Sequence, residues 1–245
     1  MNPISKVRSA LSSLPIADLN RIAGRNTAMI LAPHPDDESL GCGGLIAELC
    51  ARGCPPVVVI MTDGTASHPS SPSYPPARLR DLREREAIAA VSALGLSRER
   101  LHFLRLPDGG MPADGVSYHR IIAAIGRILQ NYHCDTIFAP WFYDPHCDHR
   151  TTQVMARALA ITFNATVLSY PVWGWLLSSA AVIPRPVTGW RLDITAHMPT
   201  KRLAINSHQS QYSDLITDDP KAFRLPVDLL SIFEQPFEVF LRSPS

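Results

Sequence analysis

The chain has 245 residues, of which 46% are hydrophobic and 18% are charged, a balance typical of a folded domain that excludes an extended disordered protein. Its formal net charge of +1 excludes the strong positive field of nucleic-acid-binding proteins, so we expect no nucleic-acid partner. The sequence has no run of roughly 20 apolar residues that would span a membrane, no apolar signal-peptide core, and cysteines without paired metal-ligand spacing. We therefore expect a cytoplasmic protein with reduced thiols.

Apolar patterning predicts a short helix and then strands that alternate with helices. Near the N-terminus, Ile4, Val7 and Leu11 recur at helical spacing and predict an amphipathic helix. The segments that follow are predicted, in chain order, as strand Ala28–Ala32, helix Ser39–Arg52, strand Val57–Thr62, helix Arg78–Leu94, strand Leu101–Leu106, helix Ser117–Gln130, strand Thr136–Ala139, helix Arg150–Phe163 and strand Thr166–Tyr170. This alternation predicts an α/β fold, a Rossmann-like three-layer sandwich with a mostly parallel sheet. Without an internal repeat or a clear linker, residues 1–245 are predicted to form a single domain.

Polar clusters follow four of the predicted strands. His34–Glu38 comes after the first strand, Asp63-Gly64 after the second, Asp108–Gly110 after the third and Asp144–His149 after the fourth. The carboxyl ends of parallel strands meet at one edge of a sheet, which is where α/β proteins place their sites. We therefore expect these clusters to face a common site.

The first cluster has the composition of a metal centre. Neighbouring carboxylates such as Asp36 and Asp37 disfavour each other's charged form unless a cation lies nearby. Histidine nitrogen and carboxylate oxygen are normal zinc ligands, so His34, Asp37 and His149 could hold one ion. Asp36 would then be free to act as general base on a metal-activated water. Glu38 has a simpler explanation, because acidic residues also stabilise the N-terminus of a helix.

Three motifs together resemble a known family. Pro33–Glu38 (PHPDDE), Gly41–Gly44 (GCGG) and His146–His149 (HCDH) are similar to the motifs of the LmbE-like/PIG-L family of zinc-dependent N-acetylglucosaminyl deacetylases. The similarity covers residues 27–212, the motif-bearing core, and leaves residues 1–26 as a helical extension. Supporting matches are Thr62-Asp63-Gly64, Arg83-x-x-Glu86, Asp108–Gly110 and His208–Gln211.

The resemblance implies a role for each matching residue. The implied metal ligands are His34, Asp37 and His149. The implied catalytic residues are Asp36 as general base, His146 at the oxyanion or the leaving amine, and Asp148 as the carboxylate that orients His146. Arg83 and Asp108 are implied to bind sugar hydroxyls of the substrate. Two positions depart from the family pattern. Cys147 stands where proline is usual, and Asp144 stands where the mycothiol-pathway deacetylase has tyrosine.

The function that follows is that of a metal-dependent hydrolase, which removes the N-acetyl group from a GlcNAc-type sugar or glycoconjugate. The cofactor expected is Zn²⁺, although a site of two histidines and one aspartate would also suit Fe²⁺. The expected partner is a small N-acetylated sugar. The residues do not identify its aglycone, and they leave a homo-oligomer open. Either Asp36 or His146 could protonate the leaving amine.

Two alternatives belong to other functional classes. A dinucleotide-binding module is suggested by Gly41–Gly44 after a strand, but the fingerprint needs a third glycine where Ile46 stands. A non-catalytic sugar-binding module could retain the same fold, although such a module would not need Asp36.

Two further features bear on the substrate. The proline-rich segment 66–76 follows the second predicted strand, so we expect it to overhang the site and to shape substrate selection. Trp173, Trp175 and Trp190 could line a sugar groove, since aromatic faces stack on sugars, or they could pack in the core.

Overall fold

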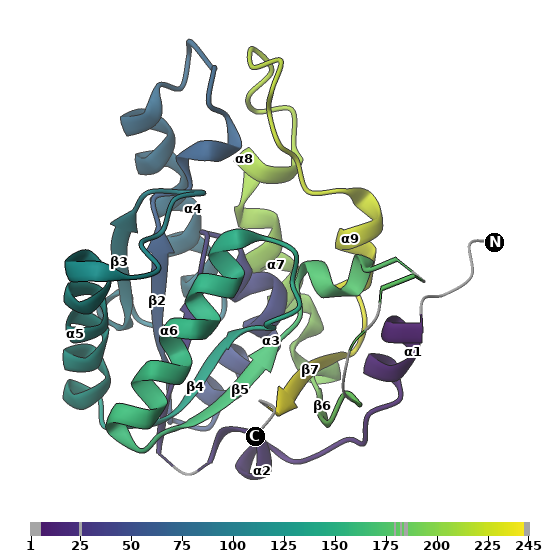
Figure 1. Ribbon diagram of the computed structural model, residues 1–245. Helices are drawn as coiled ribbons and strands as arrows, with labels where there is room; N and C mark the ends of the chain where they lie inside the picture. The colour runs from purple at the N-terminus through teal and green to yellow at the C-terminus, as the bar shows by residue number, and fades with distance from the viewer. Residues whose placement is uncertain (1–5, 25, 179, 182, 184–185, 243–245) are drawn as a thin grey trace.

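A seven-stranded sheet forms the centre of the computed structural model, which describes residues 6–24, 26–178, 180–181, 183 and 186–242. The strand order is β3-β2-β1-β4-β5-β7-β6 (Figure 1). The strands are β1 (Thr27–Ala32), β2 (Val57–Thr62), β3 (Leu101–Leu106), β4 (Cys134–Pro140), β5 (Thr166–Tyr170), β6 (Gly189–Asp193) and β7 (Phe237–Arg242). Strands β1 to β5 pair in parallel, and β7 pairs antiparallel with both β5 and β6. The predicted α/β fold with a mostly parallel sheet is confirmed.

Helices cover both faces of the sheet. They are α1 (Lys6–Ser12), α2 (Leu19–Ala23), α3 (Asp37–Ala51), α4 (Pro76–Ala93), α5 (Gly115–Asn131), α6 (Cys147–Phe163), α7 (Met198–Ser207), α8 (Gln209–Tyr212) and α9 (Val227–Ile232). One face packs on α5 and α6, and the other packs on α1, α3, α4 and α7 (Figure 1). None of the helices in the described ranges combines the length and apolar content that a bilayer crossing needs.

The central strands are buried on both faces, which explains why their sequences are apolar without interruption. In β1, Ile30 belongs to the core on the α3 side, whereas its neighbours Met29 and Leu31 belong to the core on the α5 and α6 side. All three side chains have no solvent-exposed surface. A strand buried on both faces needs apolar residues at every position, and this is the pattern that made the parallel strands recognisable.

Several boundaries and elements differ from the prediction. The predicted N-terminal helix is present as α1, although Ile4 lies outside the described residues. Helix α3 begins at Asp37, two residues before the predicted Ser39. Strands β6 and β7 and helices α2, α7, α8 and α9 were not predicted. Because β7 pairs with β5, the sheet extends past the predicted core of 27–212.

Strand β7 is tied to the glycine-rich part of α3 by a buried carboxylate. Glu238 accepts hydrogen bonds from the backbone N–H groups of Gly44 (2.7 Å) and Leu45 (2.8 Å). It also accepts one from Lys201 Nζ of α7 (2.6 Å), and both side chains are buried. Because the charge on Glu238 is paired and hydrogen-bonded, it can be held inside the protein, where it joins β7, α3 and α7.

Gly41 allows α3 to lie directly on the sheet. A Cβ atom at this position would lie 2.2 Å from Cδ2 of Tyr170, a contact that real structures do not tolerate. The Tyr170 ring has no room to withdraw, because it is fully buried and its hydroxyl donates to the carbonyl of Leu31 (2.7 Å). This close approach positions the start of α3, and with it the acidic turn that precedes the helix.

We predict that Gly41→Ala lowers the free energy of unfolding by about 1 to 3 kcal/mol, which is the usual cost of overfilling a packed core. Urea unfolding followed by circular dichroism measures the difference. Gly110→Ala is the matched control, because a Cβ there meets nothing closer than Pro107 Cβ at 3.6 Å. Its effect should stay within about 0.5 kcal/mol. Equal unfolding free energies for the two variants would contradict the packing explanation.

Candidate metal centre and active site

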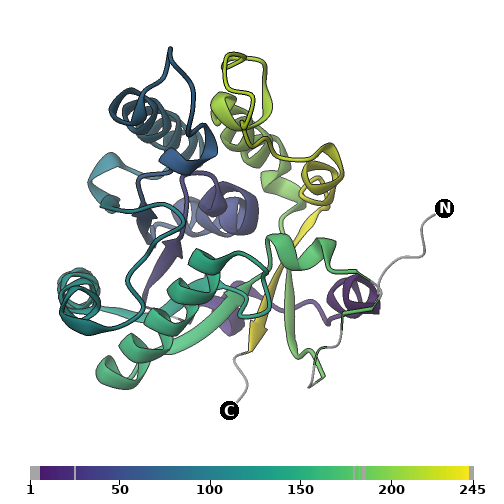
Figure 2. The ribbon, with the colours of Figure 1, turned by 45° about the horizontal axis from the view of Figure 1, so that its top comes forward.

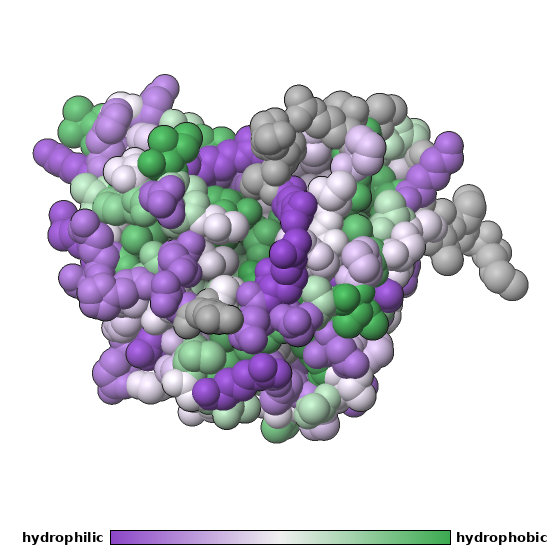
Figure 3. All heavy atoms as spheres, turned by 90° about the horizontal axis from the view of Figure 1, so that it is seen from below, coloured by the Kyte–Doolittle hydropathy of each residue, from purple (hydrophilic) through white to green (hydrophobic). Residues whose placement is uncertain are grey.

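The polar clusters meet at one edge of the sheet, as expected. With the top of the molecule tilted forward, the loops after β1, β2, β3 and β4 lie around a common centre (Figure 2). The opposite face, seen from below, carries hydrophilic side chains interspersed with smaller hydrophobic patches (Figure 3). A cavity of about 240 Å³ opens at the clustered edge and is lined by His34, Asp36, Asp37, Leu40, Ala66, Ser67, Arg83, Asp108, His146, Val172, Trp173, Gln211, Phe223 and Leu225.

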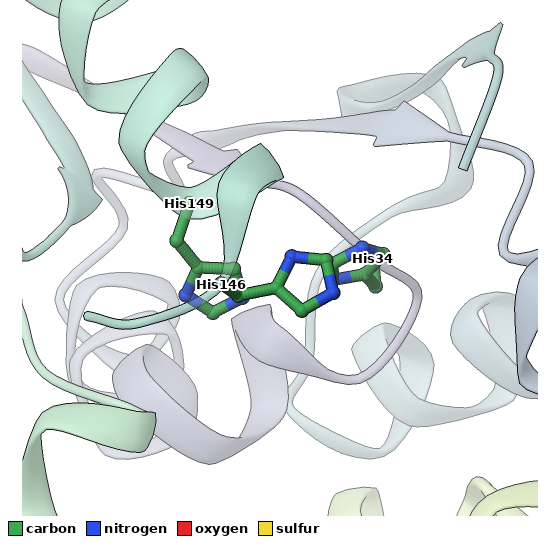
Figure 4. A group of neighbouring side chains, drawn as sticks. All are labelled: His34, His146 and His149. Atoms are coloured by element: carbon green, nitrogen blue, oxygen red, sulfur yellow. The ribbon is translucent and has the colours of Figure 1, made fainter. Parts of the chain in front are cut away.

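Asp37 lies between two histidines that come from distant parts of the chain. Its Oδ2 is 3.2 Å from His34 Nδ1 and 3.3 Å from His149 Nε2. One ring nitrogen from each of His34, His146 and His149 also lies within 4.8 Å of the other two (Figure 4). The structure thus brings together the three residues predicted as metal ligands, with His146 next to them.

The donor set fits a divalent cation. His149 Nε2 is fully buried and makes no hydrogen bond to any described residue, although it faces Asp37. An unsatisfied buried nitrogen is costly, and a cation shared with the carboxylate would remove that cost. Two imidazole nitrogens and one carboxylate oxygen form the three-ligand set of a catalytic zinc site.

Two carboxylates hold His34 from the side away from Asp37. Its Nε2 is 3.1 Å from Asp108 Oδ1 and 3.2 Å from Asp148 Oδ2. Asp148 is itself fixed by the backbone N–H of Gly109 (2.7 Å). With Nε2 engaged in this way, Nδ1 is the nitrogen left for a cation, and such carboxylate–histidine pairs are common around bound metals.

These contacts differ from those implied by the family resemblance. Asp108 accepts a hydrogen bond from the backbone N–H of Ala66 (2.9 Å) in addition to facing His34, so its two oxygens are already engaged. Asp148 places its carboxylate on His34 and Gly109, whereas its backbone N–H donates to His146 Nδ1 (3.2 Å). The hydrogen bonds of the Asp148 carboxylate therefore orient His34, where an orientation of His146 was expected.

Asp36 occupies a strained turn beside the predicted ligands. Its φ of 147° is a conformation that residues with a side chain rarely adopt, and such strain collects at functional sites. The turn is held by a hydrogen bond from its backbone N–H to Glu38 (3.0 Å). Burial raises the pKa of Asp36 to about 7, with a further contribution from Asp37 and opposition from Arg83. A carboxylate with a pKa near neutrality suits general base catalysis.

Arg83 also supports this turn. Its guanidinium donates to the carbonyl of Gly64 (2.7 Å), to the carbonyl of Pro35 (2.8 Å) and to Asp36 Oδ2 (3.2 Å). The side chain is only 3% exposed, although the residue lines the cavity. Its contacts are therefore mainly to the protein, where a role on sugar hydroxyls was expected.

Asp144 is a functional candidate for which no role was predicted, although it belongs to a polar cluster and departs from the family pattern. It is fully buried, and its Oδ2 lies 2.9 Å from His149 Nδ1. The same carboxylate accepts the backbone N–H groups of Val172 (3.0 Å), Trp173 (3.1 Å) and Gly174 (2.7 Å). Asp144 therefore orients a predicted ligand and a segment of the cavity wall at once. Its position in the polar cluster after the fourth strand was the available signal.

His146 presents a neutral ring to the cavity. Burial lowers its pKa, and the nearby His34 and His149 lower it further. Because Nδ1 accepts the hydrogen bond from the backbone of Asp148, the single proton of the neutral ring lies on Nε2. His146 is therefore a hydrogen-bond donor at the cavity wall. Its neighbour Cys147 is exposed, and its Sγ approaches the carbonyl of Gly109 at 3.9 Å and Asp148 Oδ1 at 3.8 Å.

The tryptophans separate into different roles. Trp173 lines the cavity, Trp175 is buried in the core, and Trp190 lies on β6 under the guanidinium groups of Arg21 and Arg242. The segment 66–76 contributes Ala66 and Ser67 to the cavity, in agreement with its expected place over the site.

The charge state of the histidines leads to a prediction about metal binding. Burial alone lowers the pKa of His149, but Asp37 and Asp144 raise it to about 9. Burial also lowers the pKa of His34, but the carboxylates of Asp108, Asp148 and Asp37 outweigh this effect. The pKa of His34 therefore lies well above its ordinary value. At pH 7 both rings are then protonated without metal, and each must release a proton to bind a cation.

We therefore expect the affinity for Zn²⁺ to rise between pH 6 and pH 8, by about tenfold per pH unit for each proton displaced. Titration calorimetry in two buffers of different ionisation enthalpy should show proton release at pH 7. An affinity that does not change over this range, together with equal heats in the two buffers, would contradict the assigned charge state.

Comparison with known proteins identifies the family. The PIG-L family model, described as GlcNAc-PI de-N-acetylase, matches residues 29–160. This match covers more than half of the chain, which therefore belongs to the PIG-L family.

Individual relatives show where the similarity lies. A 1D-myo-inositol 2-acetamido-2-deoxy-alpha-D-glucopyranoside deacetylase of Kineococcus radiotolerans is 31% identical over 109 residues, which is 43% of this chain but only 30% of that relative's length. A diacetylchitobiose deacetylase of Thermococcus kodakarensis is 24% identical over 198 residues, covering 76% of this chain and 70% of the relative.

Solved structures share the fold. N,N'-diacetylchitobiose deacetylase from Pyrococcus horikoshii superposes with a TM-score of 0.67 at 21% identity, covering 97% of this chain and 90% of that one. The 4-carboxy-2-hydroxymuconate hydratase GalB from Pseudomonas putida also superposes, with a TM-score of 0.57 at 21% identity, covering 75% and 78% of the two chains. Since a hydratase shares this fold, the reaction has to be argued from the site itself.

Proposed function

We propose that this protein is a metal-dependent hydrolase that removes the N-acetyl group from a GlcNAc-type sugar. The observation that carries the proposal is the contrast between two adjacent buried carboxylates. The pKa of Asp36 is raised to about 7, whereas His149 and His34 outweigh burial and hold the pKa of Asp37 well below its usual range. One carboxylate is thus suited to accept a proton and its neighbour to stay charged beside a cation. The deacetylases named among the relatives support the choice of substrate.

We propose His34, Asp37 and His149 as the residues that hold the metal, with Asp144, Asp108 and Asp148 fixing the histidine rings. A bound Zn²⁺ would act as a Lewis acid, which polarises the acetamide carbonyl and makes water more acidic. Fe²⁺ would suit the same donor set.

Asp36 is proposed to act as the general base. Its carboxylate accepts a proton from the water that attacks the acetamide carbon, which leaves a tetrahedral intermediate with a negative oxygen. Arg83 holds Asp36 in place through the contact at 3.2 Å. A residue positioned in this way typically contributes a rate factor of about 10² to 10⁴.

His146 is proposed to stabilise the oxyanion. Its neutral ring carries a proton on Nε2 and can donate it as a hydrogen bond to the negative oxygen. The same ring would become an unfavourable imidazolate if it gave this proton away. We therefore assign protonation of the leaving amine to Asp36, which holds the proton taken from the water. Acetate and the free amine sugar are then released.

Arg83 and Asp108 are proposed mainly as positioning residues, for Asp36 and His34 respectively. Both also line the cavity, so either can meet a sugar hydroxyl at its wall.

Acetate release tests the proposed function. Metal-stripped protein and the same protein reloaded with Zn²⁺ or Fe²⁺ are incubated with GlcNAc, a GlcNAc–inositol conjugate and diacetylchitobiose. We expect acetate from at least one substrate after reloading and none from the stripped protein. Sugar binding without acetate release in every metal-loaded sample would instead support the non-catalytic sugar-binding alternative.

A further inference from the structure

Part of the cavity wall is apolar. It consists of Val172, Trp173, Phe223 and Leu225, which we call the aromatic wall. The rings of Trp173 and Phe223 meet edge to face with centroids 5.6 Å apart. Phe223 is 39% exposed even though it is large and apolar. Exposed aromatic surface at the mouth of a cavity is typical of a ligand contact.

The aromatic wall is held in place before any ligand arrives. The backbone N–H of Trp173 donates to the buried Asp144, and that of Phe223 donates to the carbonyl of Ser67 (2.7 Å). Beyond Phe223, Ser71 Oγ donates to Asp218 (2.6 Å) and joins the segment 66–76 to the loop that carries Phe223. A preformed surface loses little conformational entropy when it binds.

The cavity has room for little more than the reacting sugar. Its volume of about 240 Å³ lies below the range of roughly 300 to 1,000 Å³ that is usual for small-molecule sites. The acetamide has to reach Asp36 and His146 on the polar side. A group linked to the sugar must then leave through the mouth, where Phe223 is exposed and its ring contacts Trp173.

The charges around the cavity do not favour an anionic substituent. Among the described residues that line it, Arg83 is the only one with a permanent positive charge. Its guanidinium already binds Asp36 and the carbonyls of Pro35 and Gly64. A phosphate at the mouth would therefore lose water without gaining a free cation in the lining, and it would approach the carboxylates of the site.

Building on the proposed deacetylase function, we infer that the substrate is an N-acetylated sugar whose aglycone is uncharged and apolar, an aryl or alkyl group, and that this aglycone lies against the aromatic wall. The aglycone lies away from the reacting acetamide, so the wall should bind it equally well in the ground state and in the transition state. This contact should therefore lower KM and leave kcat largely unchanged.

The test uses zinc-loaded protein and four substrates that differ only at the anomeric position, each as both anomers. They are the methyl, phenyl and octyl glycosides of GlcNAc, and GlcNAc 1-phosphate. We expect kcat/KM for acetate release from the phenyl or octyl glycoside to exceed that from the methyl glycoside by about tenfold to a hundredfold. The 1-phosphate should be the poorest substrate. Equal values for the methyl, phenyl and octyl glycosides, or a preference for the phosphate, would overturn the inference and leave the deacetylase proposal standing.

Phe223→Ala tests the wall directly. It should reduce the preference for the phenyl over the methyl glycoside to less than about threefold, mainly through KM. Phe142→Ala is the matched control, since Phe142 is similarly exposed at 37% and lies outside the cavity lining. It should keep the wild-type preference. If Phe223→Ala keeps the wild-type preference for the phenyl glycoside, the aromatic wall is not the origin of that preference.

A binding measurement separates this inference from the proposed function. If no glycoside releases acetate, the deacetylase proposal fails, and the wall is then tested by calorimetric binding of the phenyl and methyl glycosides to the same protein. Tighter binding of the phenyl glycoside by at least tenfold, lost in Phe223→Ala, would support the apolar aglycone. Equal binding of the two glycosides would overturn it.

Discussion

Replacing Asp36 with asparagine should lower kcat for acetate release by about a thousandfold, in the middle of the range for loss of a general base. Asparagine has nearly the same shape but cannot accept the proton of the attacking water. Steady-state kinetics on the best substrate of the acetate-release panel measures the loss. KM should change much less, because Asp36 acts on the transition state.

Zinc content distinguishes loss of the base from loss of the metal. The Asp36→Asn protein should bind Zn²⁺ with nearly the wild-type stoichiometry, because the three proposed ligands are retained. Asp81→Asn is the matched control, since Asp81 is an aspartate with 53% of its side chain exposed, paired with Arg80 on the surface. It should keep wild-type kcat. A fully active Asp36→Asn protein would refute the proposed mechanism.

Replacing Asp37 with alanine should abolish tight metal binding and activity together. The change removes the oxygen that lies between His34 and His149, and with it the negative charge that compensates these two buried rings. We expect the affinity for Zn²⁺ to fall by more than about a hundredfold, because loss even of a residue that only supports a ligand costs ten- to a hundredfold. Competition with a coloured chelator measures this affinity.

The same variant should be less stable. Breaking a buried ion pair typically costs about 3 to 5 kcal/mol, since it leaves an uncompensated charge inside the protein. Urea unfolding of the metal-free protein at pH 7 measures the difference, with Asp81→Ala as the exposed control. Retention of tight zinc binding in Asp37→Ala would exclude this residue as a ligand.

The central strands were predictable because burial on both faces leaves a local signal. The run Val57–Thr62 is apolar almost throughout, and it forms β2 with the predicted boundaries. β6 has no such run, since Gly189–Asp193 reads GWRLD and most of its residues are only half buried. Its place in the sheet depends on pairing with β7, more than 40 residues later, and pairing at this distance is not encoded in local pattern.

The site was predictable where the residue types alone limit the chemistry. Adjacent acids beside a histidine at a strand end indicate a cation, and the structure places His34, Asp37 and His149 around one point. The partners of these residues were not predictable in the same way. Asp148 contacts His34 from 114 positions away, and which nitrogen it meets depends on how α6 docks on the sheet. Asp144 was visible in the sequence, but its four hydrogen bonds were not.

The Asp144 carboxylate has a consequence for the whole molecule, because it binds His149 and the backbone of Trp173 through the same oxygen. The ion and the aglycone are therefore expected to be thermodynamically linked ligands. If binding of the ion changes the affinity for the aglycone by some factor, binding of the aglycone changes the affinity for the ion by the same factor. Gly174 is a residue through which this linkage can be changed without touching either ligand, because a Cβ there would press on Asp144 Oδ1 at 2.6 Å. A larger residue at position 174 is therefore expected to change the affinity for the ion and the preference for the aglycone together.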